Sequence, residues 1–124
     1  MRRLLMLVVF VSIPSLADAQ DPVQTDGDKY RVLFENDCVR VLDYTDRPGG
    51  RTSQHKHPAF VMYSLSSFKR SITLPDGKVL MRQFKEGDVM WSDSQTHIGE
   101  NMGDTPTHVV LFEMKPGIGA CARK

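Results

Sequence analysis

The stretch over residues 49–65 reads GGRTSQHKHPAFVMYSL and combines a glycine turn, two histidines and an apolar run. His55 and His57 are two residues apart, so in an extended strand both side chains point to the same face. Neutral imidazole is a good ligand for zinc, iron, copper and nickel, and two imidazoles on one face can chelate a single ion. The alternative is a pair of exposed loop histidines, because Pro58 follows directly and ends the strand.

The segments around this stretch have the pattern of a small all-β domain. Short apolar or alternating runs are separated by residues that favour positive φ, fix φ or hydrogen-bond to the local backbone. One such separator, Pro75-Asp76-Gly77, lies between two alternating runs and predicts a hairpin. Eight strands at this spacing predict a sandwich or a barrel. They cover residues 30–34, 39–44, 60–65, 68–74, 78–84, 88–91, 97–101 and 107–114.

A third histidine, His97, follows a second glycine turn in the stretch GDVMWSDSQTHIGEN over residues 87–101. Together the two stretches resemble the motifs of the cupin superfamily, a glycine turn before H-x-H and a Gly-Asp turn before H-x-x-x-N. The resemblance covers roughly residues 39–114 and is closest to small single-domain cupins, including the BauB-like proteins of β-alanine degradation. It implies a cupin double-stranded β-helix, that is, a jelly-roll barrel, with a metal at its centre and often a dimer.

The sequence departs from the cupin motifs at two places. The family's first motif has a glutamate separated from the second histidine by three or four residues, where this chain has Val61 and Met62. The second motif has a proline and a glycine before its histidine, where residues 93–96 read DSQT. The implied metal ligands are therefore limited to three residues, His55, His57 and His97.

Three-histidine iron sites occur in some cupin dioxygenases, so the resemblance implies a site for one divalent transition metal. Imidazole ligands alone do not distinguish Fe, Zn, Mn, Ni and Cu. Such a set leaves coordination positions open for substrate and for oxygen or water.

Tyr63, Trp91 and Gln95 are further candidates, for contact with a small-molecule ligand or substrate. Tyr63 has the same strand parity as His55 if the pleat continues unbroken between them. Trp91 and Gln95 belong to the second motif and precede His97. The alternatives are core packing for the two aromatic residues and a turn position for Gln95.

Residues 1–19 have the pattern of a signal peptide. Arg2 and Arg3 precede a short apolar run, and Ala17-Asp18-Ala19 matches the small-x-small cleavage pattern. The apolar run is about half of the ~20 residues that span a bilayer, although a retained anchor is the alternative. We expect a mature chain that begins at Gln20, is periplasmic or secreted, and has no membrane association after cleavage.

The mature chain is expected to form one domain, with a flexible N-terminal arm over residues 20–29, a barrel over 30–116 and a C-terminal tail over 117–124. Removing the leader takes two of 16 basic and one of 15 acidic residues, which leaves fourteen of each. A net charge near zero and no basic stripe argue against nucleic acid as a partner. The apolar residues 30–34 beside an exposed sheet edge predict a homodimer.

Cys38 and Cys121 would meet an oxidising environment after export. A bridge between them would close a long loop. The alternative, which we favour from the sequence, is a buried Cys38 and a free thiol at Cys121 on a frayed tail.

Three classes of function fit the sequence. The first is a metal-dependent enzyme of oxygenase, isomerase or lyase type acting on a small organic molecule. The second is a non-catalytic cupin module that binds a small ligand, and the third is a structural barrel that has lost its chemistry. The fold alone does not choose between them.

Overall fold

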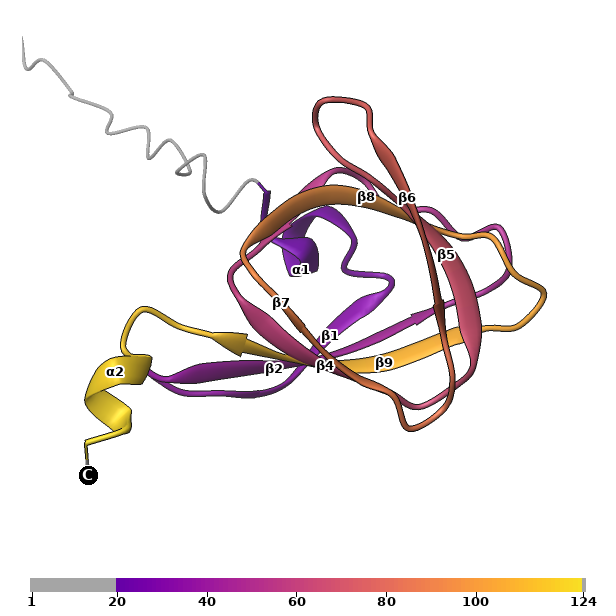
Figure 1. Cartoon of the computed structure of the whole chain (residues 1–124). Helices are drawn as coiled ribbons and strands as arrows, with labels where there is room; N and C mark the ends of the chain where they lie inside the picture. The colour runs from indigo at the N-terminus through magenta and orange to yellow at the C-terminus, as the bar shows by residue number, and fades with distance from the viewer. Residues whose placement is uncertain (1–19, 124) are drawn as a thin grey trace, which may run out of the picture.

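The computed structural model describes residues 20–123, which form nine strands and two short helices (Figure 1). The strands are β1 Tyr30–Glu35, β2 Val39–Asp46, β3 His55–His57, β4 Phe60–Ser64, β5 Phe68–Thr73, β6 Val79–Phe84, β7 Val89–Ser92, β8 Gln95–Asn101 and β9 Thr107–Met114. The helices are α1 Pro22–Thr25 and α2 Ile118–Cys121. One sheet has the order β1-β2-β9-β4-β7 and the other β3-β8-β5-β6, with antiparallel pairing throughout. This arrangement confirms the predicted all-β jelly-roll barrel.

The predicted strands are all present, with ends shifted by a few residues. β8 begins at Gln95, two residues before its predicted start, because residues 95–97 pair with β3. The predicted hairpin joins β5 and β6, and Gly77 there has the positive φ of 86° that the turn requires.

The core lies between the two sheets and is built from the inward rows of alternating strands. On β9, for example, Val109 and Leu111 are buried while Phe112 is 39% exposed on the outer face. Each fully buried large apolar side chain contributes about 1.5–3 kcal/mol. The members of this cluster are Tyr30, Leu42, Tyr44, Phe60, Met62, Phe68, Val109 and Leu111.

The segment over residues 20–29, expected as a flexible arm, is folded against the barrel. Asp21 caps α1 by accepting a hydrogen bond from the backbone of Val23 at 2.9 Å, and Pro22 occupies the first helical position. Asp21 also pairs with Arg40 at 2.6 Å, and Asp26 accepts a hydrogen bond from the backbone of Ser53. Asp21 and Pro22, which suggest a flexible turn in the sequence, are therefore the cap and the first residue of a short helix. This helix packs on β1 and β3.

The predicted signal peptide concerns residues 1–19, which lie outside the described part of the chain. Within residues 20–123 the two helices have four residues each, and neither is long and apolar enough to cross a membrane.

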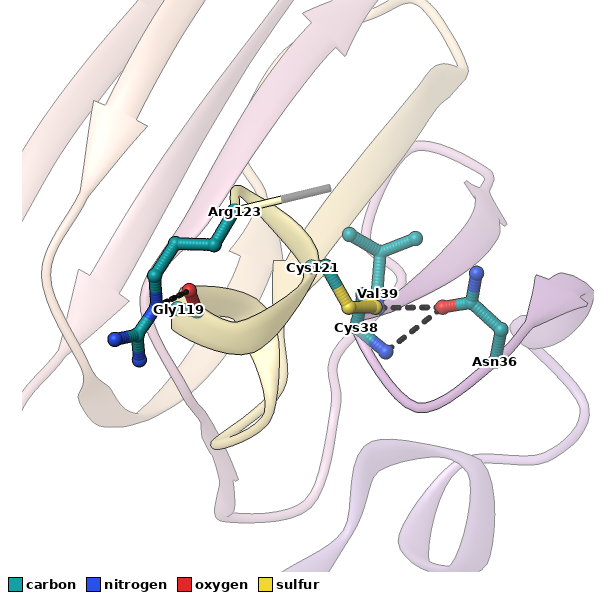
Figure 2. Close-up of a disulfide and its surroundings, with 6 residues drawn as sticks. All are labelled: Asn36, Cys38, Val39, Gly119, Cys121 and Arg123. Atoms are coloured by element: carbon teal, nitrogen blue, oxygen red, sulfur yellow. Dashed lines mark hydrogen bonds between the residues drawn. A yellow bond between two sulfur atoms is a disulfide. The ribbon is translucent and has the colours of Figure 1, made fainter.

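Cys38 and Cys121 form a disulfide (Figure 2), which corrects the free-thiol interpretation. Cys38 immediately precedes β2, and β2 pairs along its whole length with β9, so the chain after β9 returns to Cys38. The backbone of Lys115 donates a hydrogen bond to the carbonyl of Cys38 at 2.9 Å, and α2 follows. The Cα atoms of the two cysteines are 6.2 Å apart, within the ordinary range for a disulfide.

Loss of this disulfide should lower the free energy of unfolding substantially. The two cysteines are 83 residues apart, and closing a loop of that length contributes about 4.5 kcal/mol in the loop-entropy model. Urea unfolding of the double variant Cys38→Ser/Cys121→Ser should show this loss. Reductant should bring the parent to the stability of the variant and leave the variant unchanged, whereas equal midpoints without reductant would contradict the prediction.

Candidate metal centre

β3 and β8 bring the three predicted histidines together. His55 and His97 are directly opposite each other across the two strands, and His57 follows on the same inner face of β3. One nitrogen from each ring lies within 4.8 Å of the others. None of the three residues is more than 6% exposed. The predicted ligand set therefore converges on one point inside the barrel.

The orientation of two rings is set by hydrogen bonds to their Nδ1 atoms. His55 Nδ1 donates to the carbonyl of Ser53 at 2.9 Å, and His57 Nδ1 donates to Glu113 Oε1 at 2.7 Å. A carbonyl and a carboxylate only accept, so the proton is on Nδ1 and the lone pair of each neutral ring is on Nε2. Partners of this kind fix the tautomer and raise the basicity of ligating histidines.

The third ring carries an unsatisfied polar atom. His97 Nδ1 is buried and has no hydrogen-bond partner among the described residues. Burial, followed by the charges of His55 and His57, lowers the pKa of His97 to about 2, so this ring is neutral at ordinary pH. Burial likewise lowers the pKa of His55 to about 4. Neutral nitrogen donors and an orphaned ring nitrogen fit a borderline transition ion, not Ca²⁺ or Mg²⁺, which prefer oxygen ligands.

A cavity of about 360 Å³ lies beside the histidines, and both His57 and His97 line it. Its walls combine apolar and polar side chains, and this volume is in the range of small-molecule sites. The apolar lining comes from both sheets and includes Phe60, Met62, Phe68, Ile72, Leu80 and Phe84.

The solved structures that are similar to this chain include the following three. A cupin domain from Bordetella pertussis Tohama I is 25% identical, with 69% of this chain and 91% of that chain matched and a TM-score of 0.64. A conserved protein with a double-stranded β-helix domain from Klebsiella pneumoniae is 21% identical, with 90% of this chain and 91% of that chain matched and a TM-score of 0.55. The DMSP lyase DddQ from Ruegeria pomeroyi is 15% identical, with 73% of this chain and 49% of that chain matched and a TM-score of 0.54. The chain belongs to the cupin superfamily.

No protein-family model and no curated protein matches this cupin. The closer resemblance to the BauB-like cupins of β-alanine degradation therefore stays a prediction.

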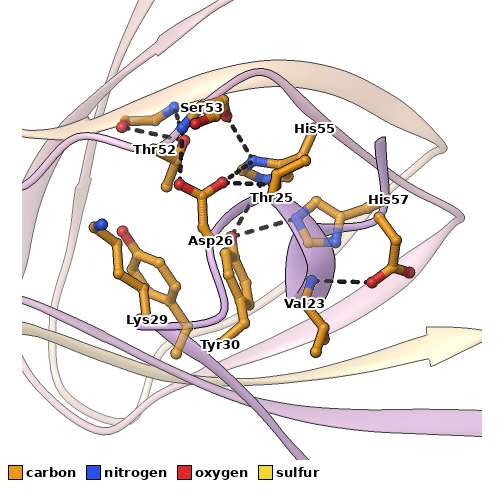
Figure 3. A network of polar contacts seen from close by, with 12 residues as sticks. Val23, Thr25, Asp26, Lys29, Tyr30, Thr52, Ser53, His55 and His57 are labelled. Carbon is orange, nitrogen blue, oxygen red and sulfur yellow. Dashed lines mark hydrogen bonds and ion pairs between the residues drawn. The ribbon is translucent and has the colours of Figure 1, made fainter. Parts of the chain in front are cut away.

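Tyr30 is a residue of the cupin site that the sequence did not indicate. Its hydroxyl donates to His55 Nε2 at 3.2 Å and lies 3.5 Å from His57 Nε2 (Figure 3). These are the two atoms that would hold an ion, so the hydroxyl would either become a ligand or move aside on binding. Tyr30 is brought there by the pairing of β1 with β2, for which no local motif exists.

Two carboxylates behind the rings were also missed. Glu113 is 1% exposed and accepts hydrogen bonds from His57 and from Arg40 Nε, both at 2.7 Å. Asp26 lies 3.6 Å from His55 Nδ1. A signal for Glu113 was present, because strand alternation gives it the same parity as the buried Val109 on β9.

Of the three predicted ligand contacts, Trp91 and Gln95 line the cavity, whereas Tyr63 does not. Tyr63 is 42% exposed on the outer face of β4, which corrects the prediction that it reaches the cavity. The strand is interrupted between β3 and β4, and the alternation restarts with Phe60 pointing inward. The parity counted from His55 is therefore reversed.

His108 lies outside the cupin site, as its lack of a motif suggests. Its Nε2 is 2.7 Å from Asp43 Oδ1, and its side chain is 42% exposed. Because it is a histidine paired with a carboxylate at the surface, it offers a matched control for the buried pair of His57 and Glu113.

Proposed function

We propose that this cupin binds one divalent transition metal through His55, His57 and His97 and acts on a small organic molecule held in the barrel cavity. The observation that supports the proposal is the convergence of three buried imidazoles at the wall of that cavity. A bound ion would supply Lewis-acid or redox chemistry there. Three neutral ligands leave positions for substrate, oxygen or water, which suits an oxygenase, isomerase or lyase.

The remaining side chains support this role. Ser53 and Glu113 hold two rings in the ligating tautomer, and the cavity beside them offers both apolar and polar side chains to a small molecule. The similarity to a DMSP lyase rests on fold alone and leaves the reaction open among these classes.

The proposal is tested by elemental analysis of the mature protein, purified without a metal-binding affinity tag. We expect about one transition-metal ion per chain, and chelator treatment should lower the melting temperature reversibly. If the protein never binds metal but is stabilised by small ligands, it is the non-catalytic binding module considered above.

We further propose that this cupin is exported. The motivating pattern is the apolar run followed by Ala17-Asp18-Ala19, and the disulfide between Cys38 and Cys121 suits an oxidising compartment. Intact mass of protein from the periplasmic fraction of a Gram-negative host should give a chain that begins at Gln20. A full-length mass in the membrane fraction would contradict export.

We also propose a homodimer with two-fold symmetry. β1 lies at the edge of its sheet, and Val32, Leu33 and Phe34 on it are 40–54% exposed. A second copy would cover this edge and its apolar side chains. Light scattering at micromolar concentration should give twice the mass of one mature chain, and Phe34→Asp should shift the particle toward one chain. A single-chain mass for the parent would contradict the dimer.

A further inference from the structure

Two arginines lie directly opposite each other on the inner face of the second sheet. Arg70 on β5 pairs with Arg82 on β6, between the apolar pairs Phe68 with Phe84 and Ile72 with Leu80. Both arginines line the cavity. Like charges at directly opposite positions destabilise a sheet, and an anion held between the two guanidiniums would offset that repulsion. Arg82 is exposed at the cavity rim, whereas Arg70 is buried.

Arg70 is also short of hydrogen-bond partners. It is 9% exposed, its Nη2 donates to the Tyr44 hydroxyl at 3.2 Å, and its Nε is buried without a partner in the described chain. The nearest carboxylate oxygen, Asp46 Oδ2, is 3.8 Å from Nη1, which balances charge but is too far for a hydrogen bond. Asp46 already accepts hydrogen bonds from Tyr44 and Asn101. A guanidinium has five N–H donors, and the buried Nε–H is one that finds no acceptor in the described chain.

Gly99 on β8 makes room for the guanidinium. A Cβ at residue 99 would clash with Arg70 Nη2, so the absence of a side chain there leaves room for the guanidinium in this position. Gly99 and His97 are two residues apart on the inner face of one strand, which separates them by roughly 6–7 Å. The positive charge of Arg70 also contributes to lowering the pKa of His97 and of His55. The guanidinium is therefore a near neighbour of the histidines.

We propose that Arg70, with Arg82 opposite it, anchors the carboxylate of a short-chain organic acid whose other end faces the three histidines. The inference rests on the proposed function for the choice of cavity. The planar fork of a guanidinium matches a carboxylate in two parallel hydrogen bonds. Two carboxylates lie close to this position, Asp46 beside Arg70 and Asp93 in the cavity lining. Their negative charge repels a dianion such as phosphate more strongly than a monoanion.

Titration calorimetry of the mature protein tests the anchor, with propanoate, butanoate and succinate as probes. Propanamide is the neutral analogue and sulfate the inorganic anion, and each is measured on metal-loaded and chelator-treated protein. We expect the monoanions propanoate and butanoate to bind, and the dianions succinate and sulfate and the neutral propanamide not to bind. Arg70→Met should weaken carboxylate binding about 10- to 100-fold, the effect of losing hydrogen bonds to a charged group. Arg70→Lys should have a carboxylate affinity between those of the parent and Arg70→Met, because lysine keeps the positive charge but cannot form two parallel hydrogen bonds to a carboxylate.

Arg51→Met is the control, because Arg51 is exposed and pairs with Glu100 outside the cavity. It should leave carboxylate binding unchanged. If Arg70→Met does not fold, Arg70→Met/Asp46→Asn removes both charges of the pair and serves in its place.

The metal content of each variant separates this inference from the proposed function. Arg70→Met should hold as much metal as the parent while losing the carboxylate. If the parent holds no metal but its chelator-treated form binds propanoate through Arg70, the metal proposal fails and the anchor stands. Equal binding of propanoate and propanamide by the parent, equal binding of propanoate and sulfate, or unchanged propanoate binding in Arg70→Met overturns the anchor.

Discussion

Alanine at any one of His55, His57 or His97 abolishes stoichiometric metal binding, if these three rings share one ion. Each substitution leaves a two-ligand site whose remaining rings cannot complete the coordination of a transition ion. The loss of affinity should exceed the ~10- to 100-fold that follows removal of an outer-shell partner. Elemental analysis and competition titration of folded variants, checked by circular dichroism, measure the loss. Retention of full metal content by all three variants would show that the site is elsewhere.

Two further variants should show a smaller loss of metal affinity and no loss, respectively. Glu113→Gln keeps the three ligands but replaces the carboxylate that holds His57 Nδ1, so metal affinity should fall by about 10- to 100-fold. His108→Ala removes a histidine that pairs with Asp43 at the surface, and metal content should stay at the parent level. A loss in His108→Ala equal to that in Glu113→Gln would point to a general effect on folding instead of on the site.

Acidification destabilises the metal-free protein steeply below pH 6.5. The folded chain holds the pKa of His55 at about 4 and that of His97 at about 2, against about 6.5 in an unfolded chain. The unfolded state therefore binds protons first, and stability is fully present above pH 6.5 and lost as pH falls. At pH 4 the two rings together remove about 6 kcal/mol, comparable to the whole stability of a small domain.

Urea unfolding of chelator-treated protein between pH 7.5 and pH 4 measures this loss. The double variant His55→Gln/His97→Gln should have a much flatter profile, because glutamine does not titrate. A parent profile that is flat from pH 6.5 to pH 4 would contradict the assignment of these rings as buried and neutral.

The three ligands could be predicted because each belongs to a local pattern. Strand parity places His55 and His57 on one face, and a glycine turn precedes His97. Tyr30 and Arg70 have no such pattern, since they reach the cavity through pairing between strands distant in sequence. Their roles depend on which strands become neighbours, and the residues next to them in the sequence do not predict that pairing.

Two errors have the same origin. The parity of Tyr63 was counted across an interruption of the strand, where the alternation restarts. The pairing of Cys38 with Cys121 depends on the antiparallel alignment of β2 and β9, which brings together residues 83 positions apart. Local residue types therefore predict which side chains can do chemistry, while long-range pairing decides which of them meet.

The first residues of the described chain also determine how this protein must be handled. Asp21 pairs with Arg40 at 2.6 Å, Arg40 with Glu113 at 2.7 Å, and Glu113 with His57 at 2.7 Å. This relay of charged groups joins the N-terminal segment to a ring at the centre of the barrel. An affinity tag attached just before Asp21 adds chain at the start of that relay. Tags therefore belong at the C-terminal end, beyond the disulfide.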